Sequence, residues 1–165
     1  MPVPDEELDT FAHRYAGWAA GIEQQARQEG QALSPRMIEI AHEMGLSQPE
    51  SLRILIKEEI PFPHEDDFLR EIGLRLGLIG PGIVGNAQTF GEMVLSRAAF
   101  AHSIPKMAHE LMHVRQVQEA GGFEPFLRKY LREVLTSGYS QAPYEIEAYA
   151  INESYAEAGD ALAAP

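Results

Sequence analysis

The feature that most restricts the possible folds is a stretch near residue 110 in which histidines recur at the helical period. Residues 103–119 read SIPKMAHELMHVRQVQE, and two glycines that typically stop a helix follow at Gly121 and Gly122. At 100° per residue, one face collects Met107, Leu111, Val114 and Gln118. The opposite face collects His109, His113 and Gln116. We expect a helix over 103–119 with an apolar back and a histidine face.

The histidine face has the spacing of a zinc-hydrolase helix. His109 and His113 are four residues apart, so their imidazoles stack one turn apart and can hold one tetrahedral zinc ion. Glu110 points to the side of that pair, where it can take a proton from metal-bound water. Gln116 lies on the same side and is placed either to hydrogen-bond within the site or to form part of a polar wall. The alternative is a chance occurrence of the pattern in an ordinary helix.

A third ligand must come from elsewhere, because catalytic zinc usually has three protein ligands and no third histidine follows in this helix. The helix predicted over 143–160 begins at Pro143 and carries Glu145 and Glu147 in its first turn. Their side chains diverge by about 200°, so both cannot reach one metal. Small residues flank each of them, and acidic residues also favour a helix N-terminus for purely local reasons. The residues alone leave this choice open.

The segments AHELMH (108–113) and APYEIEAYA (142–150) together resemble the gluzincins, a branch of the zincin-like His-Glu-x-x-His metallopeptidases. Residues 80–150 are also similar to small bacterial zincin-like proteins. The closest pattern is the Glu-x-x-Ala-Asp of the CAAX-protease-like branch, and Tyr149 stands where that branch has Asp. The resemblance implies zinc as the cofactor and Glu110 as the catalytic general base. It implies the metal ligands His109, His113 and Glu145, with Glu147 as the alternative to Glu145.

The resemblance also implies a strand that lines the cleft just upstream of the histidine helix. The segment EMVLSR (92–97) is placed for that role, in which an edge strand pairs with an extended peptide. The alternative is a two-stranded ribbon that only covers the core. From the glycine pattern we expect short strands at Ile83–Val84 and Met93–Ser96, joined by a turn around Gly85–Asn86.

The rest of the chain reads as helices with clear boundaries. The first half predicts helical segments over 5–30, 33–45, 46–59 and 60–77, and a further helix is expected over 123–136. We therefore predict one mainly α (α+β) zincin-like domain over 1–165. It comprises an N-terminal helical part (1–78), a metal-site part (79–160) and a frayed tail (161–165).

Composition narrows the chemistry further. The chain has no cysteine, which excludes disulfides, thiolate zinc fingers and cysteine nucleophiles, so a metal must be held by His, Asp or Glu. The net charge of −12 argues against nucleic acid and membrane surfaces as partners. The first residues show no signal-peptide pattern and no run of about 20 apolar residues occurs, which predicts a cytoplasmic protein. Signal-independent export remains open.

These observations favour a zinc-dependent metallopeptidase-like hydrolase that cleaves peptide bonds in a peptide or protein substrate through a metal-activated water. The alternative is a non-catalytic binding module on a zincin scaffold, with or without metal. A third possibility is a purely structural helical protein. Peptide hydrolysis also needs a group that stabilises the oxyanion. The candidates near the motif, none of which stands out, are His102, Tyr139, Tyr144 and Tyr149.

Overall fold

The computed structural model describes residues 3–163, with side chains described up to residue 156. The first half contains α1 (Asp5–Glu29), β1 (Gln31–Ala32), α2 (Pro35–Glu43), the short 3-10 turn η1 (Pro49–Ser51), β2 (Arg53–Ile56) and α3 (Asp67–Arg75). The second half contains β3 (Ala87–Phe90), β4 (Met93–Ser96), α4 (Ile104–Ala120), α5 (Phe123–Ser137), η2 (Tyr139–Gln141) and α6 (Pro143–Ala163). This confirms the mainly α (α+β) class. Part of the tail expected to fray at 161–165 lies outside the described residues.

Two of the helices in the first half begin at residues whose side chains cap them. Ser34 caps α2, its hydroxyl accepting a hydrogen bond from the Met37 N–H at 3.2 Å. Asp66 caps α3 in the same way, accepting from the Leu69 N–H at 3.0 Å. Helix α4 ends at Gly121, whose φ of 88° is a left-handed conformation that glycine adopts without strain. No helix in the described part combines the length and apolar character that crossing a bilayer requires.

The segment expected to be helical over 46–59 is a strand instead. Residues Arg53–Ile56 form β2, which pairs antiparallel with β1 and parallel with β4. The prediction was wrong because the short apolar run 54–56 has no decisive period, and pairing with two neighbours selects the extended form. Gly30 permits this sheet to approach α1 closely. A Cβ there would lie 2.5 Å from the Ala26 carbonyl oxygen and 2.9 Å from Arg53 Cβ.

The sheet has the order β1-β2-β4-β3, which corrects the assignment of the strand beside the cleft. The expected strand at Met93–Ser96 exists as β4, but it is buried between β2 and β3 and cannot offer an edge. The edge strand is β3 (Ala87–Phe90), which packs next to α4. The strand expected at Ile83–Val84 is an exposed loop.

The β3–β4 hairpin turns at Gly91 and Glu92 rather than at Gly85–Asn86. Gly91 has a φ of 62°, and a Cβ at this position would lie 2.5 Å from the Glu23 carboxylate. That carboxylate accepts a hydrogen bond from the Glu92 N–H at 2.9 Å, so helix α1 fastens the turn. A larger residue here would displace the Glu23 carboxylate and would be strained by the positive φ, so glycine at this position favours the turn.

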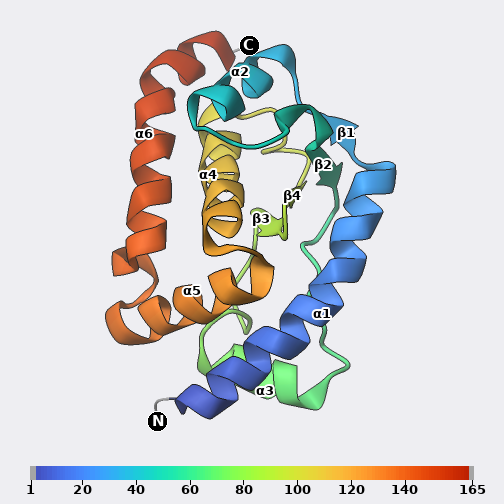
Figure 1. Ribbon diagram of the computed structural model, residues 1–165, viewed down its shortest axis with the longest axis vertical. Coiled ribbons are helices and arrows are strands. Elements are labelled where there is room, and N and C mark those ends of the chain that lie inside the picture. Colours follow the sequence, from blue (N-terminus) through green and yellow to red (C-terminus); the bar gives the residue numbers. More distant parts are fainter. Residues whose placement is uncertain (1–2, 164–165) are drawn as a thin grey trace.

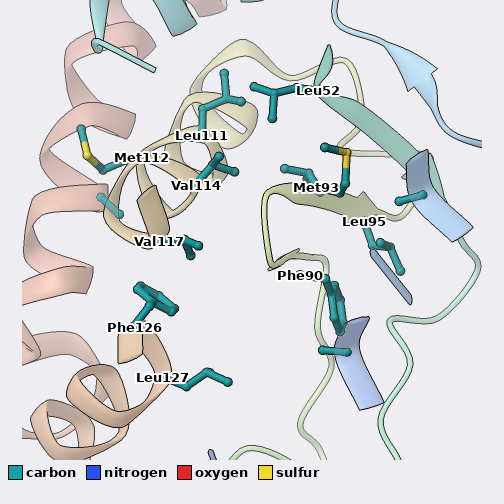
Figure 2. Packing of buried hydrophobic residues seen from close by; sticks show 14 of the residues in the cluster. Leu52, Phe90, Met93, Leu95, Leu111, Met112, Val114, Val117, Phe126 and Leu127 are labelled. Atoms are coloured by element: carbon teal, nitrogen blue, oxygen red, sulfur yellow. The ribbon is translucent and has the colours of Figure 1, made fainter. Parts of the chain in front are cut away.

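Helix α4 is the central element and is buried on most sides. Helix α6 packs along one side of it, while α1 lies beyond the sheet on the other side (Figure 1). Figure 2 shows Leu111 and Val114 turned toward Leu52 and Met93, and Met112 turned toward α6. The apolar back predicted for this helix therefore packs on the sheet, and its histidine face is left for the C-terminal helices.

Candidate metal centre

Two elements meet at the histidine face of α4. His109 and His113 lie one turn apart on α4, with ring centroids 4.9 Å apart. Glu145 lies in the first turn of α6. Ala148, one turn further on, is completely buried, and its small side chain allows α6 to pack closely on α4. The packing of these two helices therefore brings a carboxylate to the two imidazoles.

The three side chains converge on one point. Glu145 Oε1 lies 3.2 Å from His109 Nε2 and 3.3 Å from His113 Nε2. One ligand atom from each of the three residues lies within 4.8 Å of the others, and all three residues are buried. The structure thus brings together His109, His113 and Glu145.

The donor atoms fit a metal ion. Glu145 Oε1 is fully buried and has no hydrogen-bond partner among the described residues, although two imidazole nitrogens lie close to it. A buried carboxylate oxygen without a partner is costly, and a bound cation removes that cost. Two imidazole nitrogens and one carboxylate oxygen form a donor set found in catalytic zinc sites, which keep a further position open.

The ionisable groups of this cluster perturb one another. Burial by itself raises the pKa of Glu145, but the nearby imidazoles of His109 and His113 and the Tyr130 hydroxyl hold that pKa far below its usual range. Burial by itself lowers the pKa of His113, and the carboxylates of Glu145 and Glu110 outweigh it and raise that pKa. The surroundings therefore keep Glu145 ionised, as a metal ligand must be.

A chain of hydrogen bonds orients His113 from behind. Gln116 Nε2 donates to Glu147 Oε1 at 2.8 Å and to the Tyr144 carbonyl oxygen at 3.0 Å. The other end of the amide, Oε1, must therefore accept, and it lies 2.7 Å from His113 Nδ1. With the proton on Nδ1, the lone pair of His113 is on Nε2, which faces Glu145. Glu147 thus lies outside the ligand group and supports it through Gln116.

A tyrosine that the sequence did not single out completes the site. The Tyr130 hydroxyl, from α5, donates to Glu145 Oε2 at 2.6 Å. Burial and the charge of Glu145 raise the Tyr130 pKa, so the hydroxyl keeps its proton. This bond occupies one oxygen of Glu145 and leaves the other facing the histidines. One sequence feature could have pointed to Tyr130: its hydroxyl lies on the aromatic face that Phe123, Phe126 and Tyr130 form along the predicted helix.

The predicted general base is buried beside this group. Glu110 is 4% exposed, and Thr89 Oγ1 lies 3.1 Å from its Oε1 and 3.0 Å from its main-chain carbonyl oxygen. Thr89 belongs to the edge strand β3, so the sheet holds Glu110 in place at the cavity wall. Sequence reasoning did not identify Thr89, because its contact joins positions 21 residues apart.

A cavity of about 460 Å³ contacts all four residues His109, Glu110, His113 and Glu145. Of the four candidates for stabilising an oxyanion, Tyr139 lines this cavity, and its hydroxyl lies 3.3 Å from that of Tyr149. The Tyr149 ring lies against His109, with ring centroids 4.6 Å apart.

The other two oxyanion candidates lie elsewhere. Tyr144 stacks on Phe126 with ring centroids 5.1 Å apart, and His102 is exposed. Neither of them is among the residues that line the cavity. Tyr139 is therefore the candidate that the structure brings to the cavity.

Comparisons with protein-family models, with curated proteins and with solved structures find no match to this chain. The description of the site therefore rests on its own geometry, and the resemblance to gluzincins stays a prediction.

Proposed function

We propose that this protein is a zinc-dependent hydrolase that cleaves peptide bonds. The observation that carries the proposal is the convergence of His109 Nε2, His113 Nε2 and the unpartnered Glu145 Oε1. This group contacts the same cavity as Glu110, the acid that the His-Glu-x-x-His spacing assigns to proton transfer. The gluzincin-like order of a histidine helix followed by a glutamate helix supports the same reading.

In this proposal His109, His113 and Glu145 hold the ion, and zinc is favoured by the nitrogen and carboxylate donor set. When bound, zinc supplies Lewis acidity to the substrate carbonyl and to the attacking water. Tyr130 and Gln116 are positioning residues, because they orient Glu145 and His113 by hydrogen bonds. These contacts fix the ligands before any ion binds.

Glu110 is the general base of the proposed reaction. Its carboxylate accepts a proton from the attacking water and delivers it to the nitrogen of the leaving amine, so that one acid serves both halves of the hydrolysis. The Thr89 hydroxyl fixes this carboxylate at the cavity wall. Tyr139 is the candidate donor to the oxyanion: partial burial and its hydrogen bond with Tyr149 raise its pKa, which keeps the hydroxyl protonated.

The experiment is a cleavage assay on a mixture of quenched fluorescent peptides, with the protein loaded with zinc and after removal of the metal by a chelator. We expect hydrolysis that the chelator abolishes and zinc restores. Glu145→Gln should lose both zinc and hydrolysis, because a neutral amide is a poor replacement for an anionic ligand. The matched control is Glu153→Gln, an exposed position on the same helix, which should keep both.

The outcome also separates the two functional hypotheses. Stoichiometric zinc without cleavage of any peptide in the mixture would favour the binding module on a zincin scaffold. Cleavage that persists in Glu145→Gln would contradict the ligand set. The cytoplasmic location expected from the sequence stays part of the proposal, and the location of a tagged chain in cells tests it.

A further inference from the structure

We infer that the cavity beside the metal centre receives a large apolar side chain of the substrate, next to the bond that is cleaved. The inference rests on the proposed function, because it places that bond at His109, His113 and Glu145. It goes beyond that function by naming the substrate class: peptides with phenylalanine, leucine or a similar residue at this position. The inference is based on a cavity with aromatic walls. These three side chains line it, and exposed apolar residues form its rim.

The walls of the cavity come from elements that are far apart in the sequence. Helix α1, the segment before α3 and helix α5 contribute aromatic and aliphatic side chains, namely Phe11, Phe62, Phe123, Phe126, Leu127 and Leu131. The volume of about 460 Å³ falls within the range of about 300–1,000 Å³ that is typical of ligand pockets. Such a wall stabilises an apolar side chain in proportion to the area that it removes from water.

Outside the metal centre, the same walls carry no charged group that could pair with a charged side chain. The described residues that line the cavity include no lysine, arginine or aspartate, and their carboxylates, Glu110 and Glu145, belong to the metal centre. Two of the polar wall groups already contact each other, since Gln88 Nε2 donates to the Tyr15 hydroxyl at 2.6 Å. A charged substrate side chain would lose its hydration and meet only neutral hydroxyl and amide groups there, which is a large cost. The cavity therefore selects against acidic and basic residues.

The rim extends the apolar surface to solvent. Ile83 and Val84 line the cavity, yet their exposed fractions are 49% and 68%. Tyr139 also lines it and is 49% exposed. Exposed apolar side chains that cluster at the mouth of a cavity mark a binding surface, whereas scattered ones need no explanation. A peptide that covers this rim buries it and is held beside the metal centre.

The test measures binding to zinc-loaded Glu110→Gln, in which cleavage is suppressed and the apolar wall residues are unchanged. The probes are short blocked peptides that are identical except at one position, which is Phe, Leu, Ala, Glu or Lys. One methylene in an apolar pocket is worth about 10- to 200-fold in discrimination, so the Phe and Leu peptides should bind at least about tenfold more tightly than the Ala peptide. The Glu and Lys peptides should bind most weakly.

A rim variant locates this preference on the structure. Ile83→Ser combined with Val84→Ser should weaken binding of the Phe peptide by about tenfold, because an apolar contact area is lost. Both positions are substantially exposed, so folding is expected to survive. Leu135→Ser is the matched control: Leu135 is exposed on α5 and does not line the cavity, so binding should not change.

Equal affinity for the Phe, Ala and Glu peptides would overturn the inference. It would also be overturned if the uncharged apolar dye Nile red bound in the cavity while no peptide bound. Selective binding of the Phe peptide to Glu110→Gln, together with no cleavage by the unsubstituted protein, would support the inference and contradict the proposed hydrolysis. The two claims can therefore fail separately.

Discussion

The two buried faces of α4 differ in what burial requires of them. On the face toward the sheet, Leu111 and Val114 pack on apolar neighbours such as Met93 and need no polar partner (Figure 2). On the face toward α6, His109 and His113 are almost equally buried, but every nitrogen on their rings needs a partner or carries a cost. Burial alone therefore does not distinguish a face that only packs from a face that can bind an ion. Buried polar atoms without hydrogen-bond partners make that distinction.

The partners of the histidine face come from the C-terminal helices. Tyr130 on α5 and Glu145 and Glu147 on α6 all lie toward it, and Gln116 connects Glu147 to His113. Even so, His109 Nδ1 and Glu145 Oε1 have no hydrogen-bond partner among the described residues. The apolar face toward the sheet stabilises the fold. The unpartnered polar atoms on the face toward α6 lower that stability but form an arrangement suited to binding an ion.

The largest expected effect is on the chemistry at the cavity, without loss of the metal. Glu110→Gln should lower peptide hydrolysis by about 10²–10⁴-fold, the usual contribution of a general base. Zinc content should stay near the unsubstituted level, because Glu110 is assigned no bond to the ion. Cleavage rates and metal analysis of the same preparation check both halves. Loss of zinc in this variant would show that Glu110 is a ligand and that its assigned role is wrong.

The sheet face should respond in the opposite way. Leu111→Ala leaves a cavity in a fully buried position and should lower the free energy of unfolding by about 2–5 kcal/mol. Its zinc affinity at a temperature where the protein is folded should change little. Urea unfolding of the metal-free protein measures the first effect without the stabilisation that a bound ion adds. A strong loss of zinc affinity in folded Leu111→Ala would remove the distinction between the two faces.

Removing the hydrogen-bond partner of His113 should have a smaller effect, which is on zinc affinity. Gln116→Ala removes the acceptor for His113 Nδ1 and should weaken zinc binding by about 10- to 100-fold, as loss of such outer contacts typically does. Gln118→Ala is the control on the same helix. Gln118 bonds to Glu92 and Ser47 rather than to the site, so its loss should leave zinc affinity unchanged. Equal effects of the two substitutions would mean that Gln116 acts only through the fold.

The smallest effect on zinc affinity is expected at Glu147, which bonds to Gln116 rather than to a ligand. Glu147→Gln keeps an oxygen that can accept from Gln116, so zinc affinity should fall by less than about tenfold. Glu145→Gln should lower it far more. A direct titration of both variants with zinc makes the comparison. The reverse order would move the third ligand to Glu147, against the geometry of α6.

Local signals in the sequence predicted most of the helices and the strand β4, but not β2 or the order of the sheet. Caps such as Ser34 and terminal glycines act within one turn, so helix bounds can be found without knowledge of the fold. The strand β2 and the edge position of β3 depend instead on which distant segments pair with them. The turn at Gly91 likewise depends on Glu23, a residue of α1. These contacts cannot be derived from neighbours along the chain.

The candidate site shows the same division. The spacing of His109 and His113 predicted two members of the cluster, because both are set by one helical period. The choice of Glu145 over Glu147 came from the family resemblance, and the structure brings Glu145 to the histidines. Tyr130 and Thr89 reach the site through packing between elements: helical spacing places Tyr130 on an aromatic face but does not show that this face meets Glu145, and no spacing rule links Thr89 to Glu110.

The measurement that tests the central claim most directly is the zinc stoichiometry of the folded protein. Metal-free protein is titrated with zinc, and the bound metal is counted per chain for the unsubstituted protein, His109→Ala and His113→Ala. Convergence of three buried donors predicts one zinc per chain in the unsubstituted protein and loss of tight binding in both variants. A folded protein that takes up no zinc, or uptake unchanged in both variants, would contradict the account.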